Sequence, residues 1–310
     1  MPSVNTPRFL NATPRLSGGV RVGSHVSIAG GLDKAPLRGK QVGCDTIQVF
    51  TKSNRQWRAK RLSDQEVAAF KANLAATGIG PVVAHDCYLV NLAAPRRAVW
   101  KKSVAAFRVE LERAERLAIP FLVTHPGSHA GAGETEGMRR VAEAVNELHA
   151  SLPGYRVRIL LETTAGQGSS LGHRFEQLAA ILANVEQSAR VGICLDTCHL
   201  FAAGYNIRTR DGYRKTLNEL DACLGLERLQ AIHLNDSKGG LGCRVDRHEH
   251  IGEGRLGLAP FRLLLNDSRL RRVPMILETP KDDDFVTADR RNLARLRRLL
   301  NGGHGREAAS

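Results

Sequence analysis

The sequence predicts an α/β protein that forms a single-domain (β/α)8 barrel of the TIM type, and three observations support this prediction. Eight short runs rich in Val, Ile and Leu recur along the 310 residues, separated by amphipathic stretches. The runs are continuously apolar, as expected of strands buried on both faces of a parallel sheet. Six of them end in a histidine or a carboxylate. Because the carboxyl ends of barrel strands open onto one face, these side chains would converge there.

The apolar runs place the strands at residues 20–26, 45–50, 81–85, 120–125, 157–162, 191–196, 229–234 and 273–278. Eightfold alternation of strand and helix is typical of a closed barrel. An open doubly wound sheet is the alternative, but its strand ends would spread along a line. We expect one domain over residues 20–301, a disordered extension at 1–19 and a loose tail at 302–310.

The segments between the strands carry helix signals. Ser63 stands three residues before Glu66, as in a capping box. Residues 97–118 and 174–184 are also amphipathic. The last helix, at about residues 288–300, places its arginines largely away from a leucine face formed by Leu293, Leu296 and Leu300.

The charge, the apolar runs and the cysteines limit the classes of protein to which the chain can belong. The chain has 45 Lys and Arg against 31 Asp and Glu, a formal net charge of +14. Such an excess favours a polyanionic partner, nucleic acid first, although a solvated basic surface would also explain it. No apolar run approaches the roughly 18–20 residues that span a bilayer. The six cysteines form no C-x-x-C pair, which argues against a zinc ribbon and fits a reducing compartment.

The strand ends supply the candidate metal ligands. The runs VVAHD, FLVTHP, ILLETT, ICLDTCH, AIHLND and MILETP would present His85, His125, Glu162, Asp196, His233 and Glu278. A lone histidine at a strand end is more often a hydrogen-bonded core residue, and a lone glutamate is often a salt-bridge partner. Independent structural residues, however, would not all choose the same end of their strands. The joint pattern therefore indicates a metal site.

Two local groupings extend the set. His199 lies three residues after Asp196, within the first turn after the strand. In an extended segment Asp246 and His248 would point the same way, with His250 as a weaker candidate. Nine ligand-type side chains, at roughly three or four per ion, suggest two or three metals. Imidazole and carboxylate ligands favour Zn²⁺, with Mn²⁺ and Fe²⁺ as possible substitutes.

One motif is misleading. Residues 252–257 fit G-x-G-x-x-G, but no strand directly precedes them, which argues against dinucleotide binding.

Two segments have the composition of a nucleic-acid contact. Between Lys52 and Arg61 five cations surround Trp57, and such a loop could neutralise phosphates and wedge into a base stack. The alternative is a solvated loop with one packed tryptophan. Tyr88 and Leu89, just after His85, form a second possible wedge, for which ordinary packing is the alternative.

From about Val22 to Leu300 the chain resembles the endonuclease IV family of zinc-dependent apurinic/apyrimidinic endonucleases. The resemblance rests on GSHVSIAGG (23–31), HDCYLVNL (85–92), HPGSH (125–129), ETTAGQGSSLG (162–172), DTCHLFAAGYNIRT (196–209), HLNDSKGGLGCRVDRHEHIGEG (233–254) and LETP (277–280). The departures from the family pattern are mild, and none of them is at a proposed ligand. They are Ser53, Cys87, Asn206 and Cys243.

The resemblance implies a trinuclear zinc centre. His85 and His125 would hold one ion, and Glu162, the central catalytic-site residue, would bridge it to a second. That second ion would be completed by Asp196, His233 and Glu278. The third would be held by His199, Asp246 and His248. The resemblance also implies that Arg55, Tyr88 and Leu89 penetrate the duplex. His25 and Asn235, near other strand ends, are expected to orient ligands or substrate.

The implied function belongs to base-excision repair of DNA damage. The enzyme would hydrolyse the phosphodiester 5′ to an abasic site in duplex DNA, leaving a 3′-hydroxyl and a 5′-deoxyribose phosphate. We expect a monomer that binds no membrane, in the cytoplasm and associated with the nucleoid through DNA.

Two other functions remain open. A metal-dependent sugar isomerase or epimerase could use Glu162, Asp196, His233 and Glu278 alone, but that leaves the other five ligand-type residues unexplained. A non-catalytic DNA-binding protein would explain the charge but not the ligands.

Overall fold

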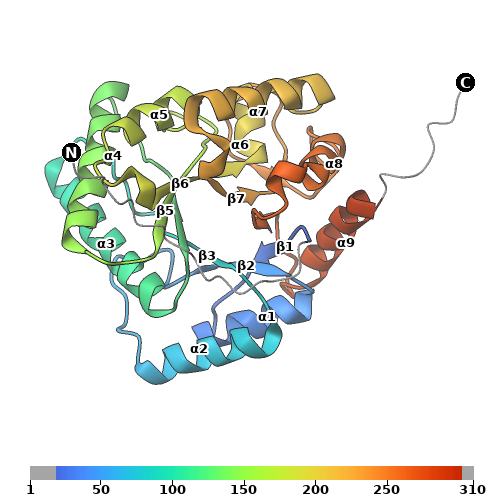
Figure 1. Cartoon of the computed structure of the whole chain (residues 1–310), viewed down its shortest axis with the longest axis horizontal. Helices are drawn as coiled ribbons and strands as arrows, with labels where there is room; N and C mark the ends of the chain where they lie inside the picture. Colours follow the sequence, from blue (N-terminus) through green and yellow to red (C-terminus); the bar gives the residue numbers. More distant parts are fainter. Residues whose placement is uncertain (1–18, 302–310) are drawn as a thin grey trace, which may run out of the picture.

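The computed structural model describes residues 19–301, so most of the predicted extension (1–19) and all of the predicted tail (302–310) lie outside the described residues. Eight parallel strands close into a barrel surrounded by helices (Figure 1). Around the barrel the order is β1 (Val22–His25), β10 (Met275–Leu277), β7 (Leu229–His233), β6 (Val191–Asp196), β5 (Arg158–Glu162), β4 (Phe121–Thr124), β3 (Val82–His85) and β2 (Thr46–Phe50). All eight predicted strands are confirmed.

Strand β1 closes the barrel by pairing with β10 on one side and β2 on the other. Gly23 faces Thr46 across the second of these pairings. A Cβ atom added at Gly23 would lie 1.6 Å from the carbonyl oxygen of Thr46, so only glycine permits this close approach. The closed pairing excludes the open doubly wound sheet.

Inside the barrel, six buried apolar side chains form one small layer. Each member of this layer stands on its strand two residues before one of the six predicted strand-end ligands. Because side chains alternate across a strand, the ligand two residues later also points inward, one layer higher. The layer consists of Val83, Val123, Leu160, Cys194, Ala231 and Ile276.

The outer ring consists of helices that pack on the barrel through a large apolar cluster. They are α1 (Ala35–Val42), α2 (Asp64–Thr77), α3 (Arg97–Arg116), α4 (Glu134–Ser151), α5 (Phe175–Ala183), α6 (Thr197–Ala203), α7 (Arg210–Leu224), α8 (Ala259–Asn266) and α9 (Thr287–Asn301). Four short 3-10 turns join them: η1 (Leu32–Lys34), η2 (Ser188–Arg190), η3 (Leu226–Arg228) and η4 (Ser268–Leu270).

The predicted helix start at Ser63 is confirmed. The backbone N–H of Glu66 donates to Ser63 Oγ over 3.1 Å, and that of Ser63 donates to Glu66 Oε2 over 2.7 Å, which confirms the capping box. On α9, Leu293 and Leu296 are fully buried, as the leucine face predicts. Along residues 19–301, no helix has both the length and the apolar character needed to cross a membrane.

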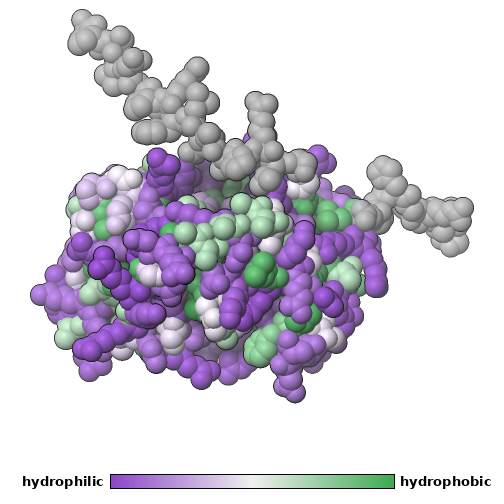
Figure 2. Space-filling view, turned by 90° about the horizontal axis from the view of Figure 1, so that it is seen from below, coloured by the Kyte–Doolittle hydropathy of each residue, from purple (hydrophilic) through white to green (hydrophobic). Residues whose placement is uncertain are grey.

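The surface is mixed. On the face shown in Figure 2, hydrophobic residues lie scattered among hydrophilic ones. All six cysteines are free, and Cys44, Cys87, Cys194 and Cys198 are buried.

Candidate metal centre

The predicted ligands meet at the carboxyl end of the barrel. Their nitrogen and oxygen atoms form three groups, within each of which the ligand atoms lie within 4.8 Å of one another. Glu162 is shared by the first two groups and Asp196 by the last two, so the three form one continuous cluster. The groups are His85–His125–Glu162, Glu162–Asp196–His233–Glu278 and Asp196–His199–His248.

Glu162 occupies the centre of this cluster, and its carboxylate is almost completely buried. Its Oε2 lies 3.1 Å from His85 Nε2 and 3.2 Å from His125 Nε2. Its Oε1 lies 3.1 Å from His233 Nδ1 and 3.2 Å from His199 Nδ1. The two oxygens thus face different histidines, which is the arrangement a bridging carboxylate requires.

The loop between β8 (Asp236–Ser237) and β9 (His248–Glu249), a short antiparallel pair, brings in Asp246. Its Oδ2 lies 3.2 Å from His199 Nε2, and its Oδ1 lies 3.4 Å from His248 Nε2. Asp246 therefore joins the two histidines of the third group, although it stands at the edge of the cluster and is partly exposed.

The orientation of two histidines provides a test of whether a cation fits. The side chain of Asp196 accepts a hydrogen bond from the backbone N–H of His199 at the start of α6, and His199 Nδ1 lies 2.8 Å from the carbonyl oxygen of Thr163. His248 Nδ1 lies 3.1 Å from the carbonyl oxygen of Glu278. These carbonyls hold a ring proton at Nδ1, so in the neutral ring the lone pair lies on Nε2.

Both Nε2 atoms are buried and make no hydrogen bond within the described part of the chain. An unpartnered buried ring nitrogen beside carboxylates is what a histidine ligand presents to a metal, with its other nitrogen held by the protein. The donor set of imidazoles and carboxylates fits zinc-like cations.

The electrostatics of the cluster also indicate a need for positive charge. Burial opposes ionisation of Glu162, but His233 and His125 hold its pKa well below the ordinary value. Burial likewise opposes protonation of His85, yet its hydrogen bonds to Asp86 and Glu162 hold its pKa well above the ordinary value. Despite its burial, Asp246 has its pKa lowered to about 2, chiefly by His199. Protons on histidines thus supply the counter-charge that a cation would otherwise supply.

The two residues expected to orient ligands lie beside the cluster. Asn235 Nδ2 donates to Asp196 Oδ2 over 2.6 Å, and Asn235 Oδ1 accepts from the backbone N–H of Glu278 over 2.8 Å. His25 Nδ1 lies 3.5 Å from Glu278 Oε1. Asn235 therefore holds two ligand-bearing segments together.

His250 lies outside the cluster of proposed ligands. It forms a separate group with Glu249 and Glu253, and its Nδ1 accepts from Asn292 Nδ2 over 3.0 Å. The amide orientation is set because Asn292 Oδ1 accepts from the backbone N–H of Ile251. An accepting Nδ1 leaves the proton on Nε2, so this ring does not present a lone pair as His199 and His248 do.

Sequence reasoning missed two buried polar residues. Gln48 stands in the apolar run TIQVF and contacts His233, Glu278 and His25. The signal available in the sequence was a polar glutamine within an otherwise apolar run. The second missed residue is Asp236.

Asp236 explains the glycine-rich segment. Its carboxylate accepts backbone N–H groups from Gly252, Gly254 and Leu256 over 2.9 to 3.1 Å. At Gly254 a Cβ would lie 2.5 Å from Asp236 Oδ1, so the chain must come this close. The G-x-G-x-x-G match is thus a loop wrapped around a carboxylate, in agreement with the rejection of a dinucleotide site.

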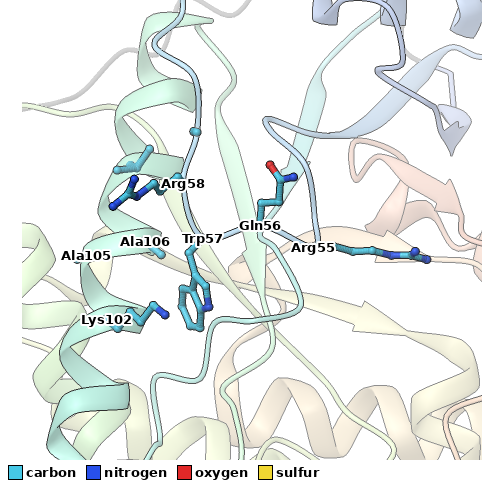
Figure 3. Close-up of a pocket in the computed structure, with 9 residues that line it drawn as sticks. Arg55, Gln56, Trp57, Arg58, Lys102, Ala105 and Ala106 are labelled. Carbon is cyan, nitrogen blue, oxygen red and sulfur yellow. The ribbon is translucent and has the colours of Figure 1, made fainter.

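The basic loop after β2 differs from expectation in one respect. Lys52 does not reach the surface, because its ammonium pairs with the buried Glu110 of α3. Arg55 and Arg58 are exposed, whereas Trp57 is half-buried. Figure 3 shows Arg55 extending away from Trp57, whose indole points toward Lys102 of α3. The loop therefore presents two different faces.

The other predicted wedge lies close to the cluster. Tyr88 is 71% exposed, and its ring centroid lies 5.6 Å from that of Phe50. The Phe50 ring in turn lies 6.0 Å from His85 and 4.3 Å from His25. Leu89 is half-buried. Tyr88 is thus an exposed aromatic side chain next to the rim of the candidate metal centre.

Comparison with known proteins identifies a family model and relatives that match this chain. Residues 38–300 match the family model described as xylose isomerase-like TIM barrel. A probable endonuclease 4 of Geobacter sulfurreducens is 55% identical over 279 residues, which cover 90% of this chain and 94% of the relative. A probable endonuclease 4 of Chloroflexus aurantiacus is 54% identical over 282 residues, covering 91% of this chain and 99% of the relative.

Two solved structures also resemble this chain. The crystal structure of endonuclease IV from Thermus thermophilus has a TM-score of 0.80 and 40% identity, and the match covers 91% of this chain and 99% of that one. A D-tagatose 3-epimerase-like protein has a TM-score of 0.69 with 18% identity, covering 91% of this chain and 98% of that one, which shows a shared fold alone.

Proposed function

The chain belongs to the endonuclease IV family, and from this premise we propose that it hydrolyses the phosphodiester 5′ to an abasic site in duplex DNA. The products would be a 3′-hydroxyl and a 5′-deoxyribose phosphate. The observation that carries the proposal is the continuous cluster in which Glu162 joins two ligand groups and Asp196 a third.

The proposed cofactor is three Zn²⁺ ions, with Mn²⁺ or Fe²⁺ as possible substitutes. The first would be held by His85, His125 and Glu162, and the second by Glu162, Asp196, His233 and Glu278. The third would be held by His199, Asp246 and His248. When bound, such ions shield the charge of a phosphodiester and lower the pKa of a water molecule from 15.7 to about 7.

The residues of the chain have distinct tasks in this scheme. Glu162 would be shared by the first two ion sites, because its Oε2 faces His85 and its Oε1 faces His233. Asn235 links Asp196 to the segment of Glu278, so that ligands from different strands move as a unit. Glu162 and Asp196 are completely buried, which keeps bulk water away from these two carboxylates, whereas His125 and Asp246 are partly exposed at the rim.

Selectivity for a lesion would come from the rim. A nucleotide that lacks its base has lost stacking, so kinking the duplex and rotating its sugar outward cost less free energy. The exposed Tyr88, with Leu89 beside it, could fill the space left in the stack. Arg55 is exposed on the neighbouring loop and could contact phosphates there.

The direct test is incubation of the metal-loaded protein with a duplex that carries one abasic analogue, followed by analysis of both new ends. We expect a 3′-hydroxyl, a 5′-deoxyribose phosphate and loss of cleavage with a chelator. Cleavage on the 3′ side, or cleavage that resists the chelator, would reject the proposal.

A matched pair of variants tests the ligand set. His248→Ala should lose one metal ion and most activity while the fold persists. His250→Ala, two residues away but outside the cluster, should keep both metal content and activity. Equal behaviour of the two variants would reject the assignment of His248.

A sugar epimerase remains the second candidate, because the group Glu162–Asp196–His233–Glu278 by itself suits one cation and the fold is shared with an epimerase-like protein. Metal counting separates the two functions. About three ions per chain favour the nuclease, and one or two favour the epimerase.

A further inference from the structure

Gln48 lies in β2 with its side chain completely buried among the proposed ligands. Its Oε1 accepts from His233 Nε2 over 2.8 Å, and its Nε2 donates to Glu278 Oε1 over 2.6 Å and to His25 Nδ1 over 3.0 Å. In the barrel, β2 and β7 are separated by β1 and β10. The amide therefore reaches across the interior to His233, and its oxygen and nitrogen both bond to residues of the site.

These contacts determine which atoms face the cluster. The oxygen of an amide only accepts, so the proton of a neutral His233 must sit on Nε2. The lone pair is then on Nδ1, which lies 3.1 Å from both Glu162 Oε1 and Glu278 Oε2. Likewise, Gln48 occupies Glu278 Oε1 and leaves Oε2 for the cluster.

We propose that Gln48 is a positioning residue of the second ligand group, selecting the nitrogen of His233 and the oxygen of Glu278 that face a cation. This inference rests on the proposed function, since it assumes that the group holds a metal. Partners that orient metal ligands typically contribute about 10- to 100-fold in metal affinity. The effect should be confined to the second ion, because Gln48 contacts neither His125 nor His248.

The test uses Gln48→Met, which keeps the shape of the side chain and removes its hydrogen bonds. Gln177→Met is the matched control, because Gln177 is also buried but its oxygen accepts from the backbone N–H of Gly172 and from no proposed ligand. Zinc retained by each full-length protein is counted over a chelator series. We expect Gln48→Met to release one of three ions at about 10- to 100-fold lower chelator strength, and Gln177→Met to release all three as the wild type does.

A second measurement needs no variant. Nitrogen-15 NMR of the histidines in the zinc-loaded wild type should show His233 protonated at Nε2 and not at Nδ1. Unchanged zinc retention in Gln48→Met, equal zinc loss in both variants, or a proton on His233 Nδ1 would overturn the inference. Cleavage of abasic duplex is measured separately: if the zinc results hold and no protein cleaves, only the proposed function fails.

A different observation concerns the outer face of the loop after β2. A hollow of about 940 Å³ lies between this loop and α3 (Figure 3). Its lining combines apolar side chains with cations and includes no acidic residue. The residues that matter here are Trp57, Arg58, Lys102, Ala105, Ala106 and Val109.

The cations of this hollow are available to a ligand. Among residues 19–301, Arg58 and Lys102 form no ion pair, and the Lys102 ammonium lies 4.4 Å from the centroid of the Trp57 ring. A ligand that suits both parts of the lining carries a negative charge next to a flat apolar group. A nucleotide has this chemistry, with a phosphate for the cations and a base for the apolar floor.

The position of the hollow favours DNA over an acidic peptide. Arg55 also lines the hollow, although its side chain extends away from Trp57, so a strand that Arg55 contacts would continue into the hollow. In a duplex the bases are stacked inside, and the apolar floor would remain unused. We infer that this hollow binds an unpaired nucleotide. That this nucleotide lies next to a lesion rests on the proposed function.

Tryptophan fluorescence tests this site. Trp100 is fully buried, so quenching by an eight-nucleotide oligothymidylate would report on Trp57. We expect quenching by wild type and about tenfold weaker binding by Lys102→Glu, because a phosphate contact is replaced by repulsion. Lys101→Glu makes the same charge change on the same helix outside the hollow, and should bind within about twofold of wild type.

The possible results distinguish failure of the nucleotide site from failure of the proposed function. Absence of quenching, equal weakening in both variants, or tighter binding of a poly-glutamate peptide than of oligothymidylate would overturn the inference. Retained cleavage of a blunt abasic duplex in that case would leave the proposed function intact. Quenching without any cleavage would reject the proposed function and keep the nucleotide site.

Discussion

The ammonium of Lys52 lies 3.1 Å from Glu110 Oε1, and the two side chains are only 3% and 1% exposed. This ion pair fastens the start of the basic loop to α3. Thr51 Oγ1 adds a hydrogen bond to Glu110, and Arg113 donates to the carbonyl oxygen of Thr51 over 2.9 Å. The Glu110 charge keeps the pKa of Lys52 raised although burial works against it.

Glu110→Ala should therefore destabilise the protein strongly. The substitution leaves a buried ammonium without its counter-charge, although the carbonyl oxygen of Gln56 still accepts from it over 2.7 Å, and breaking such a pair costs about 3–5 kcal/mol. Urea unfolding measures the change in free energy of unfolding. Lys60→Ala is the control, because its ion pair with Glu66 is exposed and should contribute little to stability. Similar losses in the two variants would contradict a structural role for the buried pair.

Asp236→Ala should release the loop that carries Asp246 and His248. The substitution leaves the backbone N–H groups of Gly252, Gly254 and Leu256 without their acceptor. We expect loss of one metal ion out of three, together with faster hydrogen exchange confined to residues 238–257. A variant that keeps three ions and an unchanged exchange pattern would show that Asp236 does not organise the site.

The metal-free protein should lose stability as the pH rises above neutrality. Burial opposes protonation of His85, His199 and His233. Neighbouring carboxylates nevertheless hold the pKa values of His85 and His199 above the ordinary 6.5, and Cys194, followed by Glu278 and Glu162, does so for His233. Their contribution is complete below pH 6.5 and is lost as the pH rises through the raised values. Glu162 and Glu278 have lowered pKa values, so their contribution is present above pH 4.5 and is lost in acid.

Metal binding should reverse this trend. Cations displace the protons of the histidines, so affinity for metal increases with pH. We expect the difference in Tm between zinc-loaded and chelated protein to widen from about pH 6 to pH 8.5, measured by calorimetry. A chelated protein whose Tm rises over that range would contradict the assigned direction of the histidine shifts.

Arg55→Ala should weaken lesion binding more than it slows cleavage once DNA is bound. Arg55 is exposed and extends away from α3, whereas the ligand cluster lies on the barrel strands. Loss of one charged contact should raise KM by about tenfold and leave kcat within about threefold. Arg108→Ala, which removes an exposed arginine paired with Glu112 on α3, is the matched control and should change neither constant. A fall in kcat alone would place Arg55 at the reacting bond.

The sequence alone determined that the chain forms a barrel and that the site lies at the carboxyl ends of its strands. Continuous apolar runs marked all eight strands, and inward alternation carried each ligand two residues beyond a buried layer residue such as Leu160 or Cys194. These are local properties, since periodicity along one strand states which way a side chain points and at which end it lies.

Only the tertiary structure decided which side chains meet. Lys52 and Glu110 are far apart in sequence, and nothing local showed that the lysine turns inward to a buried glutamate. Gln48 reaches His233 only because the sheet closes and brings β2 opposite β7. Trp57 and Arg55 separate because the loop packs on α3. Contacts between residues on different strands and helices depend on closure and packing, and these are properties of the whole chain that no short window of sequence contains.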